Sequence, residues 1–203
     1  MNIVLVGASG FIGSALLKEA VGREHRVTAI VRHPEKIAPG PRVEVFRADV
    51  TKEEDVSVLL SGADAVIVSV KFQLIDQNAL LSTLRKTRVA RILIVGGAGS
   101  LEVGPGKSLV DEPGFPAEYK AEALAAREFL HRLRGAKELN WTYLSPSAVI
   151  VPGERTGRFR LGVDRLLVDG KGESRISVED FAMAMIDELE NPKHPRMRFT
   201  VGY

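Results

Sequence analysis

The opening of the chain constrains its fold more than any other stretch. Residues 1–6 (Met-Asn-Ile-Val-Leu-Val) form a short apolar run, and glycines follow at positions 7, 10 and 13. A run of this kind is typical of a strand that is buried on both faces of a parallel sheet. Glycines directly after a strand let the backbone turn sharply and approach a ligand closely. We therefore predict a strand, a glycine turn and then a helix that begins at Phe11.

This arrangement of strand, turn and helix predicts a dinucleotide site. The first amide groups of a helix have no partner inside it, and together with the helix dipole they attract an anion such as a pyrophosphate. The spacing Gly7-x-x-Gly10-x-x-Gly13 is one residue longer than the Gly-x-Gly-x-x-Gly fingerprint. Its position between a strand and a helix nevertheless favours a dinucleotide over a simple tight turn, and Gly13 would allow the helix to pack closely on the strand.

The rest of the chain alternates between strand and helix patterns. We predict further strands at residues 26–31, 42–47, 63–70, 90–95, 141–145 and 196–201, and helices at 72–86 and 118–133. Two more helices are indicated by capping patterns, which are Thr-Lys-Glu-Glu at 51–54 and Ser-Val-Glu-Asp at 177–180. The alternation predicts an α/β fold with a Rossmann-like, doubly wound parallel sheet and a ligand crevice at the carboxyl ends of the strands.

Length and composition set the class of protein. A chain of 203 residues with 45% hydrophobic residues fits one nucleotide-binding domain (1–203), in which residues 152–176 form a small accessory segment on the substrate side. We expect short strands near 159–161 and 165–168. The chain has no cysteine, which excludes disulfides and thiolate chemistry. Its 28 basic and 26 acidic residues are interspersed, and no apolar run approaches the roughly 20 residues of a membrane span. We expect a cytoplasmic protein with a small-molecule substrate and no nucleic-acid or membrane partner.

Arg32 closes the second predicted strand, where folds of this class recognise the adenosine ribose. A carboxylate at this point accepts a hydrogen bond from the 2′-hydroxyl of NAD, whereas an arginine accommodates the 2′-phosphate of NADP. Here Arg32-His33 stands in place of the carboxylate. A guanidinium matches a phosphate with two charge-assisted hydrogen bonds. We predict that NADP(H) is preferred, with NAD(H) as the alternative coenzyme; a solvated loop charge is the competing interpretation of Arg32.

Residues 96–116 interrupt the regular alternation. This stretch holds six glycines and three prolines and leaves from the carboxyl end of a predicted strand. Long loops inside a domain are usually either functional or disordered. We interpret it as a wall or lid of the substrate site, with surface disorder as the alternative.

Several motifs together resemble a known family. They are residues 7–13 (Gly-Ala-Ser-Gly-Phe-Ile-Gly), 95–103 (Val-Gly-Gly-Ala-Gly-Ser-Leu-Glu-Val), 118–120 (Glu-Tyr-Lys), 152–157 (Pro-Gly-Glu-Arg-Thr-Gly) and 176–181 (Ile-Ser-Val-Glu-Asp-Phe). The chain resembles, over nearly its whole length, the NAD(P)H-binding, NmrA-like branch of the atypical short-chain dehydrogenase/reductases, and within it the NADH-flavin reductase group. The resemblance implies an oxidoreductase whose coenzyme contacts Gly7, Ala8, Ser9, Gly10, Phe11, Ile12, Gly13, Arg32, Asp49, Val50, Ser69, Val70, Lys71, Gly96 and Gly97.

The chain departs from the wider superfamily at one catalytic pair. Reductases of carbonyls carry Tyr-x-x-x-Lys, because residues four apart share a helix face and the ammonium can lower the pKa of the phenol. This sequence has Tyr119-Lys120, with Ala123 where the lysine would stand. Adjacent helix residues point about 100° apart, so Lys120 cannot replace it. Carbonyl reduction therefore loses support.

Reduction of a flavin fits the missing pair better. The product charge spreads over a conjugated ring and water can supply the second proton, so the protein has chiefly to position the reactants. We consider Phe72 and Phe115 as stacking surfaces for the acceptor and Tyr119 as a catalytic or orienting hydroxyl, although ordinary packing is the favoured interpretation of each. Arginines at 155, 158 and 160 could meet a substrate phosphate, but a solvated hairpin face is the favoured interpretation.

Two other functions stay open at this point. A redox-sensing protein of NmrA-like type would bind NADP(H) and contact a protein partner without turnover. An epimerase or dehydratase of a nucleotide-sugar is less favoured, because it also needs the tyrosine–lysine pair and usually a larger substrate domain.

Overall fold

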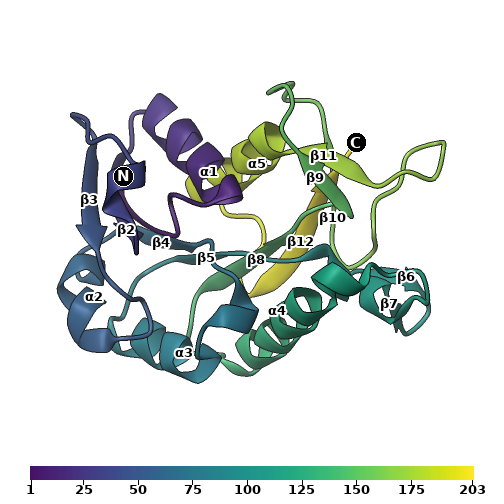
Figure 1. Cartoon of the computed structure of the whole chain (residues 1–203), viewed down its shortest axis with the longest axis horizontal. Helices are drawn as coiled ribbons and strands as arrows, with labels where there is room; N and C mark the ends of the chain where they lie inside the picture. The colour runs from purple at the N-terminus through teal and green to yellow at the C-terminus, as the bar shows by residue number, and fades with distance from the viewer.

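The computed structural model describes residues 1–203 and is built on one eight-stranded sheet (Figure 1). Its strand order is β3-β2-β1-β4-β5-β8-β12-β10, and every neighbouring pair is parallel except β10 with β12. The order 3-2-1-4-5 is that of dinucleotide-binding folds, so the predicted fold class is confirmed. The strands are β1 (Asn2–Val6), β2 (Arg26–Val31), β3 (Val43–Arg47), β4 (Ala65–Val68), β5 (Ile92–Val95), β8 (Trp141–Ser145), β10 (Arg160–Gly162) and β12 (Met197–Gly202).

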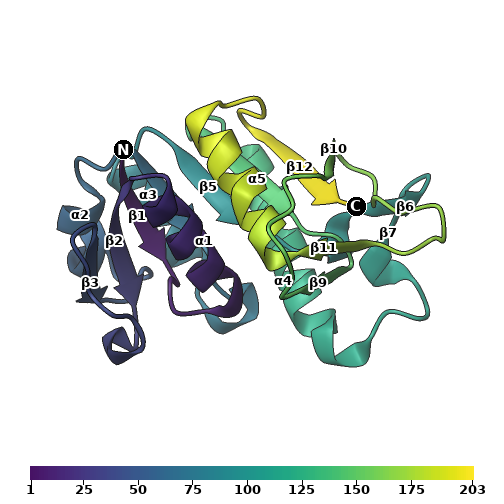
Figure 2. The ribbon, with the colours of Figure 1, turned by 90° about the horizontal axis from the view of Figure 1, so that it is seen from above.

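Five helices cover the two faces of this sheet (Figures 1 and 2). One face carries α1 (Phe11–Gly22) and α5 (Val178–Glu190), and the other carries α2 (Glu53–Leu60), α3 (Gln77–Lys86) and α4 (Ala117–Gly135). As predicted, Ser177 caps α5 by accepting a hydrogen bond from the amide of Asp180 at 3.0 Å. No helix combines the length and the apolar character that a membrane span requires.

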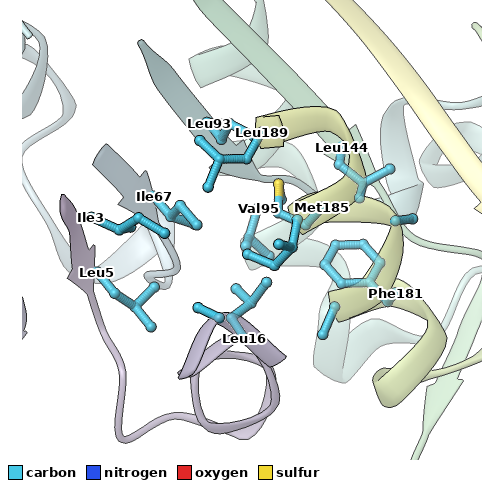
Figure 3. Close-up of a cluster of buried hydrophobic side chains, with 14 of the residues drawn as sticks. Ile3, Leu5, Leu16, Ile67, Leu93, Val95, Leu144, Phe181, Met185 and Leu189 are labelled. Atoms are coloured by element: carbon cyan, nitrogen blue, oxygen red, sulfur yellow. The ribbon is translucent and has the colours of Figure 1, made fainter. Parts of the chain in front are cut away.

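Alternation along the strands divides the interior into two cores. Ile3 and Leu5 of β1 point toward α1 and α5, whereas Val4 and Val6 point to the opposite face, because successive side chains of a strand alternate. Figure 3 shows the first core, in which Leu16 of α1 packs with Phe181 and Met185 of α5 over the sheet. Both faces of the central strands are therefore buried, which accounts for the continuous apolar runs in the sequence.

The glycine turn allows α1 to approach the sheet very closely. Gly7 has φ +83°, a backbone conformation that favours glycine. A Cβ atom at Gly13 would lie 2.0 Å from the carbonyl oxygen of Gly7, and a Cβ atom at Gly7 would lie 1.9 Å from the carbonyl oxygen of Ser69. The predicted role of Gly13 in close packing of helix on strand agrees with these distances.

Two predicted helix starts are wrong. The helix expected at 72–86 is divided into a 3₁₀ turn, η2 (Phe72–Leu74), and α3, because Asp76 caps α3 by accepting from the amides of Asn78 and Ala79. The capping box expected at Thr51 does not form. Lys52 is the N-cap residue of α2 and the Thr51 hydroxyl donates to Asp49 at 2.7 Å instead.

The glycine-rich segment 96–116 folds into short elements. They are η3 (Ala98–Ser100), the two-stranded sheet of β6 (Glu102–Gly104) and β7 (Lys107–Ser108), and η4 (Leu109–Asp111). Leu101 and Val110 are fully buried, so this segment packs on the body of the molecule. It leaves from β5 and leads into α4, which places it beside the carboxyl ends of the strands.

The accessory segment 152–176 differs in detail from the prediction. Residues 165–168 form no strand, and Arg165 makes only an isolated bridge to Glu102. Instead of forming a hairpin, β10 extends the main sheet beside β12. A second two-stranded sheet, β9 (Val149–Val151) with β11 (Arg175–Ser177), was not predicted, since its strands are short and lie far apart in the sequence.

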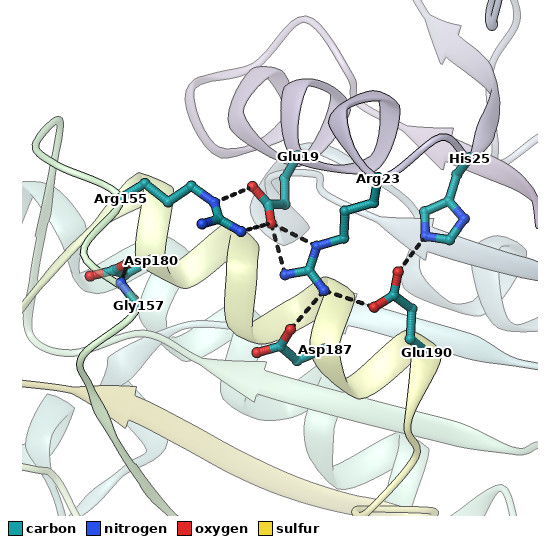
Figure 4. Close-up of polar contacts among 8 residues, drawn as sticks. All are labelled: Glu19, Arg23, His25, Arg155, Gly157, Asp180, Asp187 and Glu190. Carbon is teal, nitrogen blue, oxygen red and sulfur yellow. Dashed lines mark hydrogen bonds and ion pairs between the residues drawn. The ribbon is translucent and has the colours of Figure 1, made fainter.

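Ionic contacts hold the accessory segment against α1 and α5 (Figure 4). Arg155 donates twice to the carboxylate of Glu19 on α1, each time at 2.8 Å, and Arg23 binds the same carboxylate. The hydrogen bonds from Arg155 and Arg23 lower the pKa of Glu19, although its partial burial opposes them. Asp180 of α5 is fully buried and accepts from the amide of Gly157 at 2.9 Å. The segment is thus fixed at two points on neighbouring helices.

Replacing Gly13 by alanine tests the close approach of α1. The added methyl group would collide with main-chain atoms that cannot rotate away, so we expect the free energy of unfolding to fall by about 1 to 3 kcal/mol. Gly22→Ala is the matched control, because it lies in the same helix with no atom within 4 Å of the added group. Urea unfolding of the two variants measures the difference, and equal stability would contradict the packing described here.

Candidate functional site

Two adjoining cavities open at the carboxyl ends of the parallel strands. The larger one has a volume of about 710 Å³ and the smaller one of about 420 Å³. We call them the large cavity and the small cavity. They share Gly10, Ser69, Val70 and Lys71. A continuous groove therefore runs from the edge of β2, past the glycine turn, to the region beside α4.

The glycine turn lies where the two cavities meet. Of its residues, Gly7, Ser9 and Gly10 line the small cavity, while Phe11 and Ile12 line the large one together with Gly10. No side chain caps α1, so the first amide groups of this helix keep their donors free at the groove. The absence of side chains at Gly7 and Gly10 leaves room for a ligand beside these amides. The turn thus fits an anionic diphosphate.

Two residues of the turn that were assigned to the coenzyme line neither cavity. Ala8 is 1% exposed and belongs to the core below α1, and Gly13 packs against Gly7 and Ala8. They support the turn from behind rather than facing the groove.

The small cavity carries the charged groups expected near an adenosine. Arg32, Asp49 and Val50 line it, as the sequence predicted, and His33 and Lys36 lie beside them. Asp49 accepts from the amide and the hydroxyl of Thr51, at 3.0 and 2.7 Å, and these bonds lower the pKa of its carboxyl. The positive charge of Arg32 lowers it further. Asp49 is therefore held ionised by its own turn, which leaves the exposed Arg32 side chain free of a hydrogen-bonded partner.

A buried tyrosine supports the glycines at the end of β5. Gly96 and Gly97 line the large cavity, and a Cβ atom at Gly96 would lie 1.9 Å from the ring of Tyr143. The Tyr143 hydroxyl accepts from the amide of Gly97 at 3.2 Å and donates to the carbonyl of Ala126 on α4 at 3.1 Å. Complete burial raises the pKa of Tyr143, so the hydroxyl keeps its proton for the second bond.

The predicted acceptor-side residues all reach the large cavity but differ in their surroundings. Phe72 is 2% exposed and stacks on Phe129 with ring centroids 4.5 Å apart, so most of its surface is used in packing. Phe115 is half-buried. Tyr119 is 63% exposed and its hydroxyl makes no hydrogen bond within the protein. These three side chains therefore lie around one cavity.

The position four residues after Tyr119, where carbonyl reductases carry a lysine, is used for packing. Ala123 lies at that position and is 9% exposed. A Cβ atom at Gly99 would lie only 2.7 Å from the Cβ atom of Ala123, so α4 and η3 touch through their smallest side chains. With alanine at this position the contact closes the wall of the cavity, and no lysine stands beside Tyr119.

Sequence reasoning missed two carboxylates and the 146–150 segment in the large cavity. Glu122 accepts from the amides of Phe72 and Gln73, at 2.8 and 3.0 Å, and so joins α4 to the turn after β4. Glu112 lines the cavity and pairs with Lys107 at 2.8 Å. The helical spacing puts Glu122 on the same face of α4 as Tyr119. Which strand end this face contacts depends on the fold and could not be predicted from the spacing. In the small cavity the missed residues include Lys36, Leu74, Ile75 and Asp76.

The sequence pattern of one family covers this whole arrangement. The defining pattern of the NAD(P)H-binding family matches residues 7–192, from the glycine turn to the end of α5. The chain belongs to the NAD(P)H-binding family. The resemblance to the NmrA-like, atypical short-chain dehydrogenase/reductases is thereby confirmed.

Relatives of this family member are similar over their full length. It is 40% identical over 209 residues to the uncharacterized protein YwnB of Bacillus subtilis, which covers 99% of this chain and 98% of that protein. A proposed epimerase from Bacteroides thetaiotaomicron has a structure with a TM-score of 0.94 and 47% identity, covering 100% of this chain and 96% of that one. A proposed NADH-flavin reductase from Streptococcus pneumoniae has a TM-score of 0.84 and 32% identity, covering 100% and 99%.

Proposed function

We propose that this protein is an NAD(P)H-dependent reductase that transfers a hydride to a flavin or a similar conjugated acceptor. The observation that carries the proposal is the large cavity, which adjoins the glycine turn and is lined mainly by apolar groups but contains no tyrosine–lysine pair. When bound, the reduced nicotinamide supplies the hydride. The acceptor gains two electrons and two protons in all, one proton with the hydride and one from water, while NAD(P)H becomes NAD(P)⁺.

The two cavities would bind different parts of the coenzyme. In this proposal the amides of Phe11 and Ile12 hold the diphosphate, and Asp49 and Val50 lie on the adenosine side. Residues 69–71 and 96–97 line the large cavity at the ends of β4 and β5, and would position the nicotinamide half. The apolar walls exclude water from the reacting atoms, which favours hydride transfer over side reactions.

The lack of a cation that would assist the Tyr119 hydroxyl as a proton donor favours a flavin over a carbonyl as the acceptor. A carbonyl acceptor develops a localised alkoxide that needs a proton during the reaction. Tyr119 has no cation at Ala123 to assist it, and its hydroxyl is largely exposed. A flavin ring spreads the charge, so positioning suffices. The relative named as a proposed NADH-flavin reductase supports this choice, whereas an epimerase would need the missing pair.

We infer that NADPH is the preferred coenzyme, because Arg32 lines the small cavity where the adenosine would lie and no carboxylate closes β2. Replacing Arg32 by glutamate should weaken NADPH binding at least about tenfold more than NADH binding, since a charge-assisted phosphate contact becomes a repulsion. Fluorescence titration of both coenzymes measures the two dissociation constants.

Arg42→Glu is the matched control for this titration. Arg42 is an exposed arginine close to β3 that lines neither cavity and contacts Glu24, and its replacement changes the net charge equally. The control should leave the preference between the coenzymes unchanged. Equal weakening of NADPH and NADH by Arg32→Glu would refute the 2′-phosphate role.

Steady oxidation of NADPH with added riboflavin tests the reductase, in the natural protein and in Tyr119→Phe. We expect turnover in both, with the rate of Tyr119→Phe reduced by no more than about tenfold, a barrier change of about 1.4 kcal/mol. The reason is that the exposed hydroxyl orients the acceptor rather than protonating it. A much larger loss would mean that Tyr119 supplies a proton.

The same measurement separates the reductase from a redox sensor of NmrA-like type. A sensor would bind NADPH tightly and give no turnover with any flavin, whereas the reductase turns over at a rate that depends on acceptor concentration. As part of the proposed function we place the protein in the cytoplasm, where both NADPH and free flavins occur.

A further inference from the structure

The charges around the large cavity are few and mostly negative. Of its 26 lining residues, only Lys71, Glu112 and Glu122 carry a charge, and two of these are carboxylates. The small cavity, in contrast, is lined by three cations, Arg32, Lys36 and Lys71, as well as by the carboxylates of Asp49 and Asp76. The cations of the site are therefore gathered on the side that we assign to the coenzyme.

Lys71 cannot readily serve a second ligand. It is the one cation that reaches the large cavity, and it lies on the rim that both cavities share with Gly10 and Ser69. The ion pairs of lysines are those of Lys86 with Glu53 and of Lys107 with Glu112, so the ammonium of Lys71 is available to a coenzyme that crosses this rim. Once the coenzyme is bound, the acceptor region keeps only the two carboxylates.

The arginines that could have met a phosphate are used elsewhere. Arg155 binds Glu19 on α1 (Figure 4), and Arg160 donates to the carbonyl oxygens of Val168 and Tyr203. Arg158 lines neither cavity. None of the three arginines therefore lines the large cavity.

The two carboxylates are held in place by the fold. Glu122 accepts two main-chain hydrogen bonds and has no cation as partner, and Glu112 is fixed by Lys107, which itself does not line the cavity. A phosphate group brought into this region would lose hydration and face the carboxylate of Glu122, whose charge no cation offsets, while Lys107 offsets the charge of Glu112 alone. Such an arrangement is unfavourable for a second anion. An uncharged ring would meet the apolar walls, among them Phe115 and Ile150.

We propose that the acceptor is a flat, conjugated and uncharged molecule without a phosphate group, so that the site selects riboflavin-like rings against their phosphorylated forms. This inference rests on the proposed function and narrows its substrate class. The redox change is the one given above, in which the ring gains two electrons and two protons and NADPH becomes NADP⁺. The phosphate takes no part in it, so the selection arises from binding alone.

Riboflavin and FMN are suitable probes, because they share the reacting ring and differ by one phosphate. At saturating NADPH and low ionic strength, we expect kcat/KM for riboflavin to exceed that for FMN by about tenfold or more in the natural protein. In Glu112→Arg the ratio should move toward FMN by about tenfold, because a cation replaces a carboxylate at the cavity wall. Glu112→Gln should shift the riboflavin-to-FMN ratio of kcat/KM in the same direction, but by a smaller factor.

Glu118→Arg is the matched control. It makes the same change of charge near the start of α4, at an exposed residue that does not line the cavity, and should leave the ratio unchanged. If FMN is reduced as well as or better than riboflavin, or if Glu118→Arg shifts the ratio as much as Glu112→Arg, the inference is wrong while the reductase stands. Absence of turnover with both flavins would contradict the proposed function, and the inference with it.

Discussion

The structure depends on contacts that only glycine permits at the end of the first strand. The carbonyl oxygens of Ser69 and Gly7 occupy the space where side chains at Gly7 and Gly13 would otherwise lie. Through these contacts α1 rests directly on the ends of β1 and β4, with its free amide groups directed into the groove. Both cavities meet at this point, so the position of the glycine turn determines where a coenzyme can bind and which strand ends face the acceptor.

The opposite wall of the site depends on α4. Glu122 joins this helix to the turn after β4, and the Tyr143 hydroxyl joins its Ala126 carbonyl to the glycines after β5. The contact between Ala123 and Gly99 closes the remaining gap. The helix that carries the catalytic pair in carbonyl reductases therefore serves here as a packed wall, and in the proposed reaction the protein would contribute chiefly by positioning the reactants.

The sequence allowed the parallel sheet and its alternation with helices to be predicted, because these features follow from local patterns. The strand at 26–31 has the predicted bounds, the helix capped by Ser177 begins where it was predicted, and Arg32 lies in the small cavity. The errors arose where a distant or competing partner decides the structure. Asp76 divides a helical pattern that is continuous in the sequence, and Asp49 takes the Thr51 hydroxyl that would have capped α2. The carboxylates of the large cavity could not be predicted, since their positions depend on how α4 meets the strand ends.

Amide chemical shifts during a titration with NADP⁺ test the central claim most directly. In a ¹⁵N-labelled sample, the account predicts saturable shifts at the amides of Phe11 and Ile12, accompanied by shifts at Gly96 and Gly97 across the groove. Shifts that leave Phe11 and Ile12 unchanged at saturation, or no saturable shifts at all, would contradict the claim that the glycine turn and the start of α1 bind the coenzyme.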